Sequence, residues 1–168
     1  MREQAKTSGG FTLIEMMIAI TLMAILMAIA VPSFKDASLG SEVRSIANDL
    51  VAHAALARSE AIKRNAIVTL CVSADGLTCG AGGWEQGWIV KPAIAGAPPI
   101  LVEPAAAAGF RITGSTDAIN FRSIGAGTTA ATLKVCRATP TVGHQERLVT
   151  IDAVGRAWVK ATALATCP

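Results

Sequence analysis

Four cysteines are the residues of this chain whose chemistry can be judged most directly from their spacing. All of them follow an apolar segment that ends near residue 31, at Cys71, Cys79, Cys136 and Cys167. An even number of cysteines beyond an export signal is typical of two disulfides formed in an oxidising compartment. A metal site is the alternative, but no two cysteines form a CxxC pair, and both histidines, His53 and His144, lie far from them in sequence. We therefore predict two disulfides and no metal.

Three pairings of these cysteines are possible. We favour Cys71 with Cys79 and Cys136 with Cys167. The first bridge would staple a short loop that leaves a strand, and the second would tie the C-terminal end to an inner strand. A bridge that closes about 30 residues stabilises a domain by roughly 3–4 kcal/mol in the loop-entropy treatment.

Motifs of enzyme chemistry are missing from the sequence. It contains no GxSxG, no HExxH, no phosphate-binding P-loop and no dinucleotide fingerprint. The glycine-rich stretch at residues 80–83 has no Lys-Ser or Lys-Thr after it, so we interpret it as a turn. We predict that the chain is not an enzyme and that it carries no cofactor.

One acidic residue, Glu15, interrupts an otherwise apolar run. Residues 11–31 read FTLIEMMIAITLMAILMAIAV, about the length that crosses a hydrocarbon core of roughly 30 Å as a helix. A carboxylate inside a bilayer costs roughly 2.5–3.5 kcal/mol, so it is usually there for a partner. If the chain is cut after Gly10, Phe11 gains a free ammonium one helical turn from Glu15. A neighbouring copy could then place its ammonium against this carboxylate and fix the axial register of a bundle.

The ten residues before the run, MREQAKTSGG, set its orientation. Arg2 and Lys6 outweigh Glu3, and positive charge before an apolar span keeps that end in the cytoplasm. A secretory signal peptide is the alternative, because residues 28–30 form an A-x-A cleavage site. Its apolar region, however, is usually only about 7–15 residues long, and it gives no reason for Glu15.

The sequence Gly10 followed by FTLIEMMIAITLMAIL resembles the class III signal of type IV pilins and pseudopilins. The resemblance implies that a prepilin peptidase in the inner membrane cuts after Gly10 and N-methylates Phe11. It also implies that Glu15 docks the subunit and that Pro32 bends the helix. The partners would be other major and minor pilins in a filament, and the inner membrane before assembly.

The remainder of the chain predicts one long helix followed by strands. Apolar residues recur every three or four positions beyond Pro32, which indicates that residues 32–65 continue the helix as an amphipathic segment. Short β-branched runs separated by turn signals then predict strands at 66–72, 87–91, 100–103, 110–113, 119–122, 132–137, 147–152 and 156–160. The expected fold is α+β, a long helix packed on an antiparallel β-sheet domain spanning residues 66–168.

The order of features around the first two cysteines narrows the resemblance. The stretch ARSEAIKRN, the two cysteines about an Asp-Gly turn, and Trp84 with Trp88 are similar to the FimT/FimU branch, which shares the GspH-type domain. We expect both tryptophans to pack in the core rather than to contact a partner at the surface. The resemblance implies a minor pilin that primes assembly of a type IV pilus. A minor pseudopilin of type II secretion is the alternative, since it uses the same N-terminus.

A third hypothesis is DNA binding for natural transformation. Some FimT-like pilins carry a basic Gly-Arg-x-Arg motif, and the matching stretch here, Gly155-Arg156-Ala157-Trp158, lacks the second arginine. Arg156 and Lys160 could contact phosphates and Trp158 could stack on a base. We favour the alternative, a plain strand with Arg156, Trp158 and Lys160 on one face and Ala157 and Val159 on the other. One arginine and one lysine give little counterion release, so any such binding would be weak and sensitive to salt.

Overall fold

The computed structural model describes residues 10–124, 128–140, 146–162 and 167. The chain divides into two compact units, the first ending at Ser38 and the second beginning at Leu39. Residues 1–9, most of the predicted leader, lie outside the described part.

Helix α1 (Leu13–Arg64) begins two residues later and ends one residue earlier than predicted. In the first unit its apolar side chains are exposed throughout, including Leu13, Ile20 and Ile29. Pro32 lies inside the helix, which is not interrupted there. A proline removes one helical hydrogen bond and crowds the preceding turn. The bend that we expect at Pro32 stays a prediction.

In the second unit, α1 buries a narrow stripe against the sheets. Seven residues that recur at intervals of three or four, with Ala47 directly after Ile46, have at most 8% of their surface exposed: Val43, Ile46, Ala47, Leu50, Ala54, Ala57 and Ala61. This is the periodicity of an amphipathic helix. The stripe changes from Val, Ile and Leu to alanine toward the end of the helix. The small side chains there let the backbone lie close to the strands.

The end of α1 is fixed by local chemistry. Asn65 has φ of 50°, the amide of Asn65 donates to the Ile62 carbonyl at 3.3 Å, and the amide of Ala66 donates to the Ala61 carbonyl at 3.2 Å. These two bonds form a Schellman motif, with asparagine in the left-handed position that usually takes glycine. Lys63 and Arg64 complement the negative end of the helix dipole. The chain then turns into the first strand.

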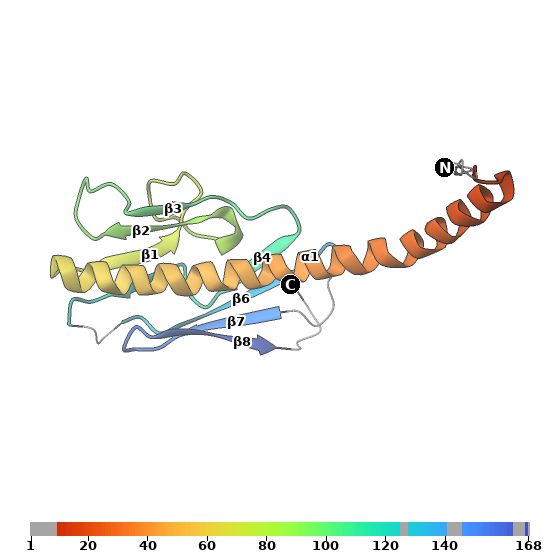
Figure 1. The fold of residues 1–168 in the computed structure, drawn as a ribbon. Coiled ribbons are helices and arrows are strands. Elements are labelled where there is room, and N and C mark those ends of the chain that lie inside the picture. The colour runs from red at the N-terminus through yellow and green to blue at the C-terminus, as the bar shows by residue number, and fades with distance from the viewer. Residues whose placement is uncertain (1–9, 125–127, 141–145, 163–166, 168) are drawn as a thin grey trace, which may run out of the picture. The chain divides into compact units, whose positions relative to one another are not determined.

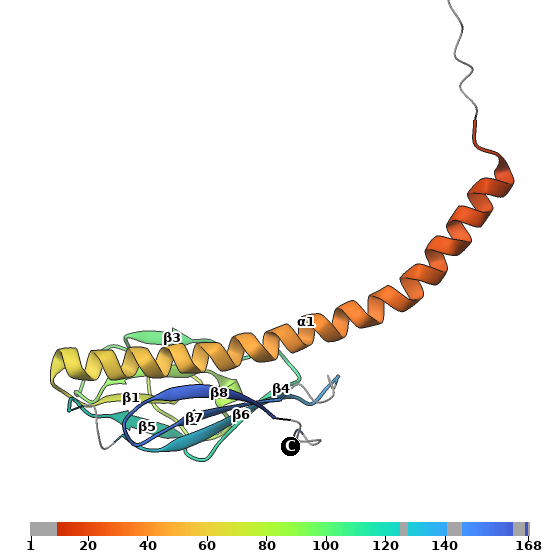
Figure 2. The ribbon, with the colours of Figure 1, turned by 60° about the horizontal axis from the view of Figure 1, so that its bottom comes forward.

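Within the described residues, eight strands form two antiparallel sheets of four strands each (Figures 1 and 2). The first sheet has the order β3-β2-β1-β5 and the second β4-β6-β7-β8. Their bounds are β1 (Val68–Val72), β2 (Trp88–Pro92), β3 (Leu101–Glu103), β4 (Phe110–Gly114), β5 (Ala118–Phe121), β6 (Ala131–Arg137), β7 (Glu146–Ile151) and β8 (Ala157–Thr162). Each predicted strand is present within two residues of its expected bounds, and the predicted α+β fold is confirmed.

A single core joins the helix to both sheets. It contains Leu50 from α1, Leu70 from β1 and Leu133 from β6, all fully buried. Trp84, in the short 3₁₀ helix η1 (Trp84–Gln86), and Trp88, in β2, are also buried, as expected for core packing. Each buried indole N–H has an acceptor. Trp84 Nε1 donates to the Thr116 carbonyl and Trp88 Nε1 to His53 Nδ1, both at 2.9 Å.

Candidate functional site

The start of α1 is organised by two side chains. Thr12 precedes the helix, and its backbone N–H and its hydroxyl donate to Glu15 Oε2 at 3.0 and 2.8 Å. In return, the Glu15 backbone N–H donates to the Thr12 hydroxyl at 3.3 Å. This reciprocal pattern is a capping box, which satisfies two amides that the first turn leaves without helical partners.

Glu15 was predicted from the sequence as a functional residue, whereas Thr12 was not. The sequence could have identified Thr12 as a capping residue, because Thr-x-x-Glu ahead of an apolar run is the sequence pattern of a capping box. Glu15 thus has a local structural role in addition to the docking role expected for it. The capping hydrogen bonds use Oε2 only, and Oε1 has no hydrogen bond within the described part of the chain.

The surface around this carboxylate is apolar and open. Phe11 is 84% exposed, and Gly10 beside it is also exposed, so the expected cleavage point is accessible. The apolar part of α1 is long enough to cross a membrane, and none of it is buried within the chain. A signal sequence would meet the same criteria of length and composition. What distinguishes this segment is the carboxylate held at the head of the apolar surface.

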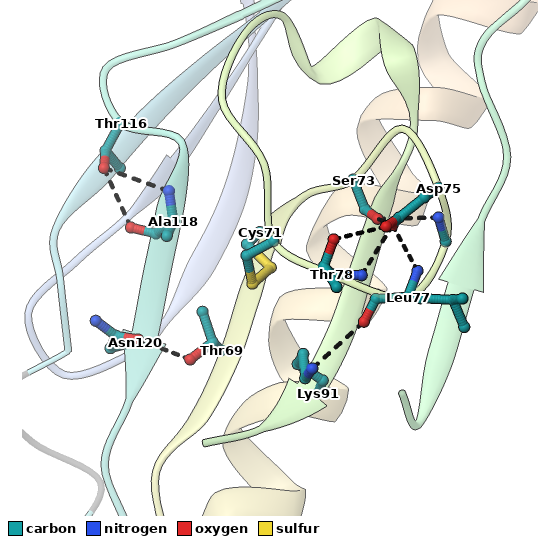
Figure 3. Close-up of a disulfide and its surroundings, with 12 residues drawn as sticks. Thr69, Cys71, Ser73, Asp75, Leu77, Thr78, Lys91, Thr116, Ala118 and Asn120 are labelled. Carbon is teal, nitrogen blue, oxygen red and sulfur yellow. Dashed lines mark hydrogen bonds between the residues drawn. A yellow bond between two sulfur atoms is a disulfide. The ribbon is translucent and has the colours of Figure 1, made fainter. Parts of the chain in front are cut away.

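The four cysteines form Cys71–Cys79 and Cys136–Cys167, the pairing that we favoured among three. Cys71 lies in the central strand β1 and is fully buried, so the bridge anchors its loop to the middle of the first sheet (Figure 3). The second bridge joins Cys136 in β6 to Cys167. Over the described ranges, no group of three or more His, Cys, Asp or Glu residues could hold a metal ion.

Asp75 organises the loop closed by the first disulfide (Figure 3). Its Oδ2 accepts the Thr78 hydroxyl at 2.6 Å, and its Oδ1 accepts the amides of Thr78 and Leu77 at 2.8 Å and the Ser73 hydroxyl at 2.9 Å. These bonds, those from Thr78 first, lower the pKa of Asp75 well below its ordinary value. Hydrogen bonds to the charged form favour ionisation. The loop is therefore held by a covalent bond at its ends and by a carboxylate in its middle.

The residues considered for DNA contact lie at β8, an edge strand. Trp158 and Lys160 are exposed, whereas the alternate residues Ala157 and Val159 are partly buried. Arg156 precedes the strand, with its guanidinium carbon 5.3 Å from the centre of the Trp158 ring. Its Nε also pairs with Asp152 Oδ2 at 3.2 Å. The structure thus brings Arg156 and Trp158 together but partly neutralises the arginine.

Comparisons with known proteins agree with this architecture. Residues 47–155 match the family described as Type II transport protein GspH, and residues 5–31 match the prokaryotic N-terminal methylation motif. A comparison with curated protein sequences gives no significant match.

Solved structures with the same fold include one minor pilin and one minor pseudopilin. The type IV minor pilin FimU of Pseudomonas aeruginosa superimposes in two crystal forms. Its TM-scores are 0.58 and 0.56 at 21% and 20% identity, covering 75% and 73% of this chain and 93% and 96% of the solved chains. The minor pseudopilin EpsH of the Vibrio cholerae type 2 secretion system has a TM-score of 0.54 at 14% identity, covering 71% of this chain and 97% of its own. These identities establish the fold alone.

The methylation motif implies processing by a prepilin peptidase and assembly with other pilin-like subunits, and the family consists of structural subunits rather than enzymes. With a GspH match over more than half of its length behind that motif, this chain belongs to the Type II transport protein GspH family and is a minor pilin or pseudopilin.

Proposed function

We propose that this chain is a minor pilin of a type IV pilus that helps to prime filament assembly. Prepilin peptidase removes residues 1–10 by cutting after Gly10 and N-methylates Phe11. Residues 11–31 hold the subunit in the inner membrane, with the N-terminus in the cytoplasm. Residues 32–65 continue the helix, and residues 66–168 form the periplasmic β domain.

The observation that carries this proposal is the carboxylate at the head of an exposed apolar helix. An exposed surface of that size needs lipid or other helices to cover it. Glu15 keeps Oε1 free of the cap, so a second subunit can present the ammonium of its own Phe11 to that oxygen. Such a pairing in an apolar bundle fixes register, because any other alignment leaves a buried charge without a partner.

A pair of variants separates the two roles of Glu15. Glu15→Gln removes the charge but retains a residue that serves in a capping box, whereas Thr12→Ala removes the cap and leaves the charge. We expect the Gln variant to be processed normally yet missing from sheared filaments. The Ala variant should lose only about 1 kcal/mol of helix stability and still be incorporated. Immunoblots of filament and membrane fractions measure both. Normal incorporation of the Gln variant would contradict the docking role.

Mass spectrometry of the chain from native membranes tests the processing step. We expect a mature chain that begins at N-methylated Phe11. A chain that begins at Val31 would show ordinary signal-peptide cleavage and would refute the proposal.

The pilus is favoured over the secretion pseudopilus by the arrangement around Cys71. The disulfide loop, followed at once by the buried Trp84 and Trp88, is the combination that resembles FimU-like pilins. A deletion strain decides between the two. We expect loss of surface pili that the intact gene restores, with secretion of folded proteins unchanged. The reverse phenotype would assign the chain to type II secretion.

DNA binding is a weaker second candidate, supported by the exposed Trp158 and Lys160 beside Arg156. Affinity for nucleic acid depends on how many phosphates are neutralised, and Asp152 already pairs with Arg156. Fluorescence anisotropy with an oligonucleotide at low and high salt tests it. A salt-sensitive signal lost in Lys160→Gln would support this role.

A further inference from the structure

A groove of about 420 Å³ lies between α1 and the start of β8. The helix contributes Arg58, Ser59 and Ile62, and the turn before β8 contributes Gly155 and Arg156. Both walls belong to the second compact unit. Neither the N-terminal assembly segment nor the two disulfides take part in it.

The groove carries positive charge and no acidic side chain lines it. Arg58 Nε is buried and has no hydrogen-bond partner in the described part of the chain. That buried atom faces away from the groove, so an incoming acceptor would meet the terminal nitrogens of the guanidinium, which have no ion pair or hydrogen bond in the described part of the chain. Arg156 is different, since Asp152 and the Trp158 ring already hold it. The groove therefore presents about one uncompensated positive charge.

Gly155 allows the groove to form. Its φ is +73°, and a Cβ there would lie 3.0 Å from Thr128 Oγ1 and 3.2 Å from Arg58 Cδ. Any side chain would thus be strained and would press on the stem of Arg58. With glycine, the turn packs directly against that stem and limits where the guanidinium can go. A guanidinium held in place loses less entropy when it binds a ligand.

We propose that this groove binds a carboxylate of a neighbouring filament subunit. An arginine fork matches an aspartate or glutamate in two parallel hydrogen bonds. One uncompensated charge suits one carboxylate, whereas a nucleic-acid backbone needs several cations in a row. The helix wall includes the exposed Ala55 and Ser59, whose small side chains let another chain approach closely. The assignment rests on the proposed function in a filament.

Photocrosslinking in the native host tests the assignment on the full chain. Benzoylphenylalanine replaces Ile62, which lines the groove and is 51% exposed. After irradiation, peptide mass spectrometry should identify a second pilin subunit joined through a segment that contains Asp or Glu. Arg58→Met keeps the stem but removes the charge, and it should lower the yield about tenfold. Arg44→Met, at an exposed arginine on the same helix, is the matched control and should leave the yield unchanged.

Exchanging the charges of Arg58 and of the partner's acidic residue is the decisive test. Arg58→Glu should abolish the crosslink, and replacement of the partner's acidic residue by arginine should restore it. An unchanged crosslinking yield in Arg58→Met, or a crosslinked segment without an acidic residue, would overturn the groove assignment. The proposed function would survive that result as long as the chain is found in the filament fraction. If the wild-type chain is missing from that fraction, the proposed function fails and the groove assignment fails with it. Oligonucleotide binding at low salt that Arg58→Met removes would reassign the groove to phosphate and also overturn the proposal.

Discussion

The two disulfides should differ in how much they stabilise the chain, because they close loops of very different length. Cys71–Cys79 spans 8 positions and Cys136–Cys167 spans 31. Loop entropy gives about 2.5 kcal/mol for the first and about 3.7 kcal/mol for the second at 25 °C. The packing lost when two cysteines are replaced by alanine should be similar for the two pairs, so it nearly cancels when the two variants are compared. Each pair joins one buried cysteine, Cys71 or Cys136, to a more exposed partner.

Double replacements by alanine measure the difference. We expect the Cys136/Cys167 variant to lose about 1 kcal/mol more than the Cys71/Cys79 variant, as the logarithm of loop length requires. Urea unfolding of the full chain in detergent micelles, followed by the fluorescence of the buried Trp84 and Trp88, gives both values. Wild-type protein treated with a reducing agent is the control, and it should be at least as unstable as either variant. A greater loss from the shorter loop would refute the loop-entropy reasoning for this fold.

Three further predictions concern the second unit. His53→Phe leaves the buried Trp88 N–H without its acceptor and should cost about 1–3 kcal/mol in urea unfolding, whereas His53→Asn keeps an acceptor and should recover most of it. Gly87→Ala should cost more than about 1 kcal/mol, because φ is +107° and the new Cβ would lie 2.7 Å from the Glu103 carbonyl oxygen; thermal denaturation that shows no loss would contradict this contact. The lowered pKa of Asp75 means that its ionised form stabilises the fold above about pH 4, and that this contribution is lost as the pH falls below 4 toward the lowered pKa. The stability difference between wild type and Asp75→Asn should therefore shrink on acidification, and a difference that grows would contradict the sign.

The elements of this fold could be predicted from local patterns, whereas their pairing could not. The stripe from Val43 to Ala61 and the turn signals around the strands are short-range features, and they located α1 and all eight strands. The division into two sheets depends on long-range pairs. β1 joins β5, and β4 joins β6, with other strands between them in sequence. No periodicity within one strand encodes such a partner.

The candidate sites divide in the same way. The motif around Gly10, Phe11 and Glu15 is contiguous and was predicted from the sequence alone. Thr12 could also have been predicted, because its spacing from Glu15 is that of a capping box. The groove between Arg58 and Gly155 was not, since it depends on a turn that packs against a helix from a distant part of the chain.

The buried stripe of α1 also determines how the second unit would respond to a pulling force. Its anchoring side chains, from Val43 to Ala61, are spread along the helix rather than gathered at one end. Tension applied along the helix axis would therefore load all of these contacts together, in shear, instead of opening them one after another. The second disulfide ties Cys167 to β6. Because β7 and β8 lie between the two bridged cysteines, a pulling force could not stretch out that segment while the disulfide is intact.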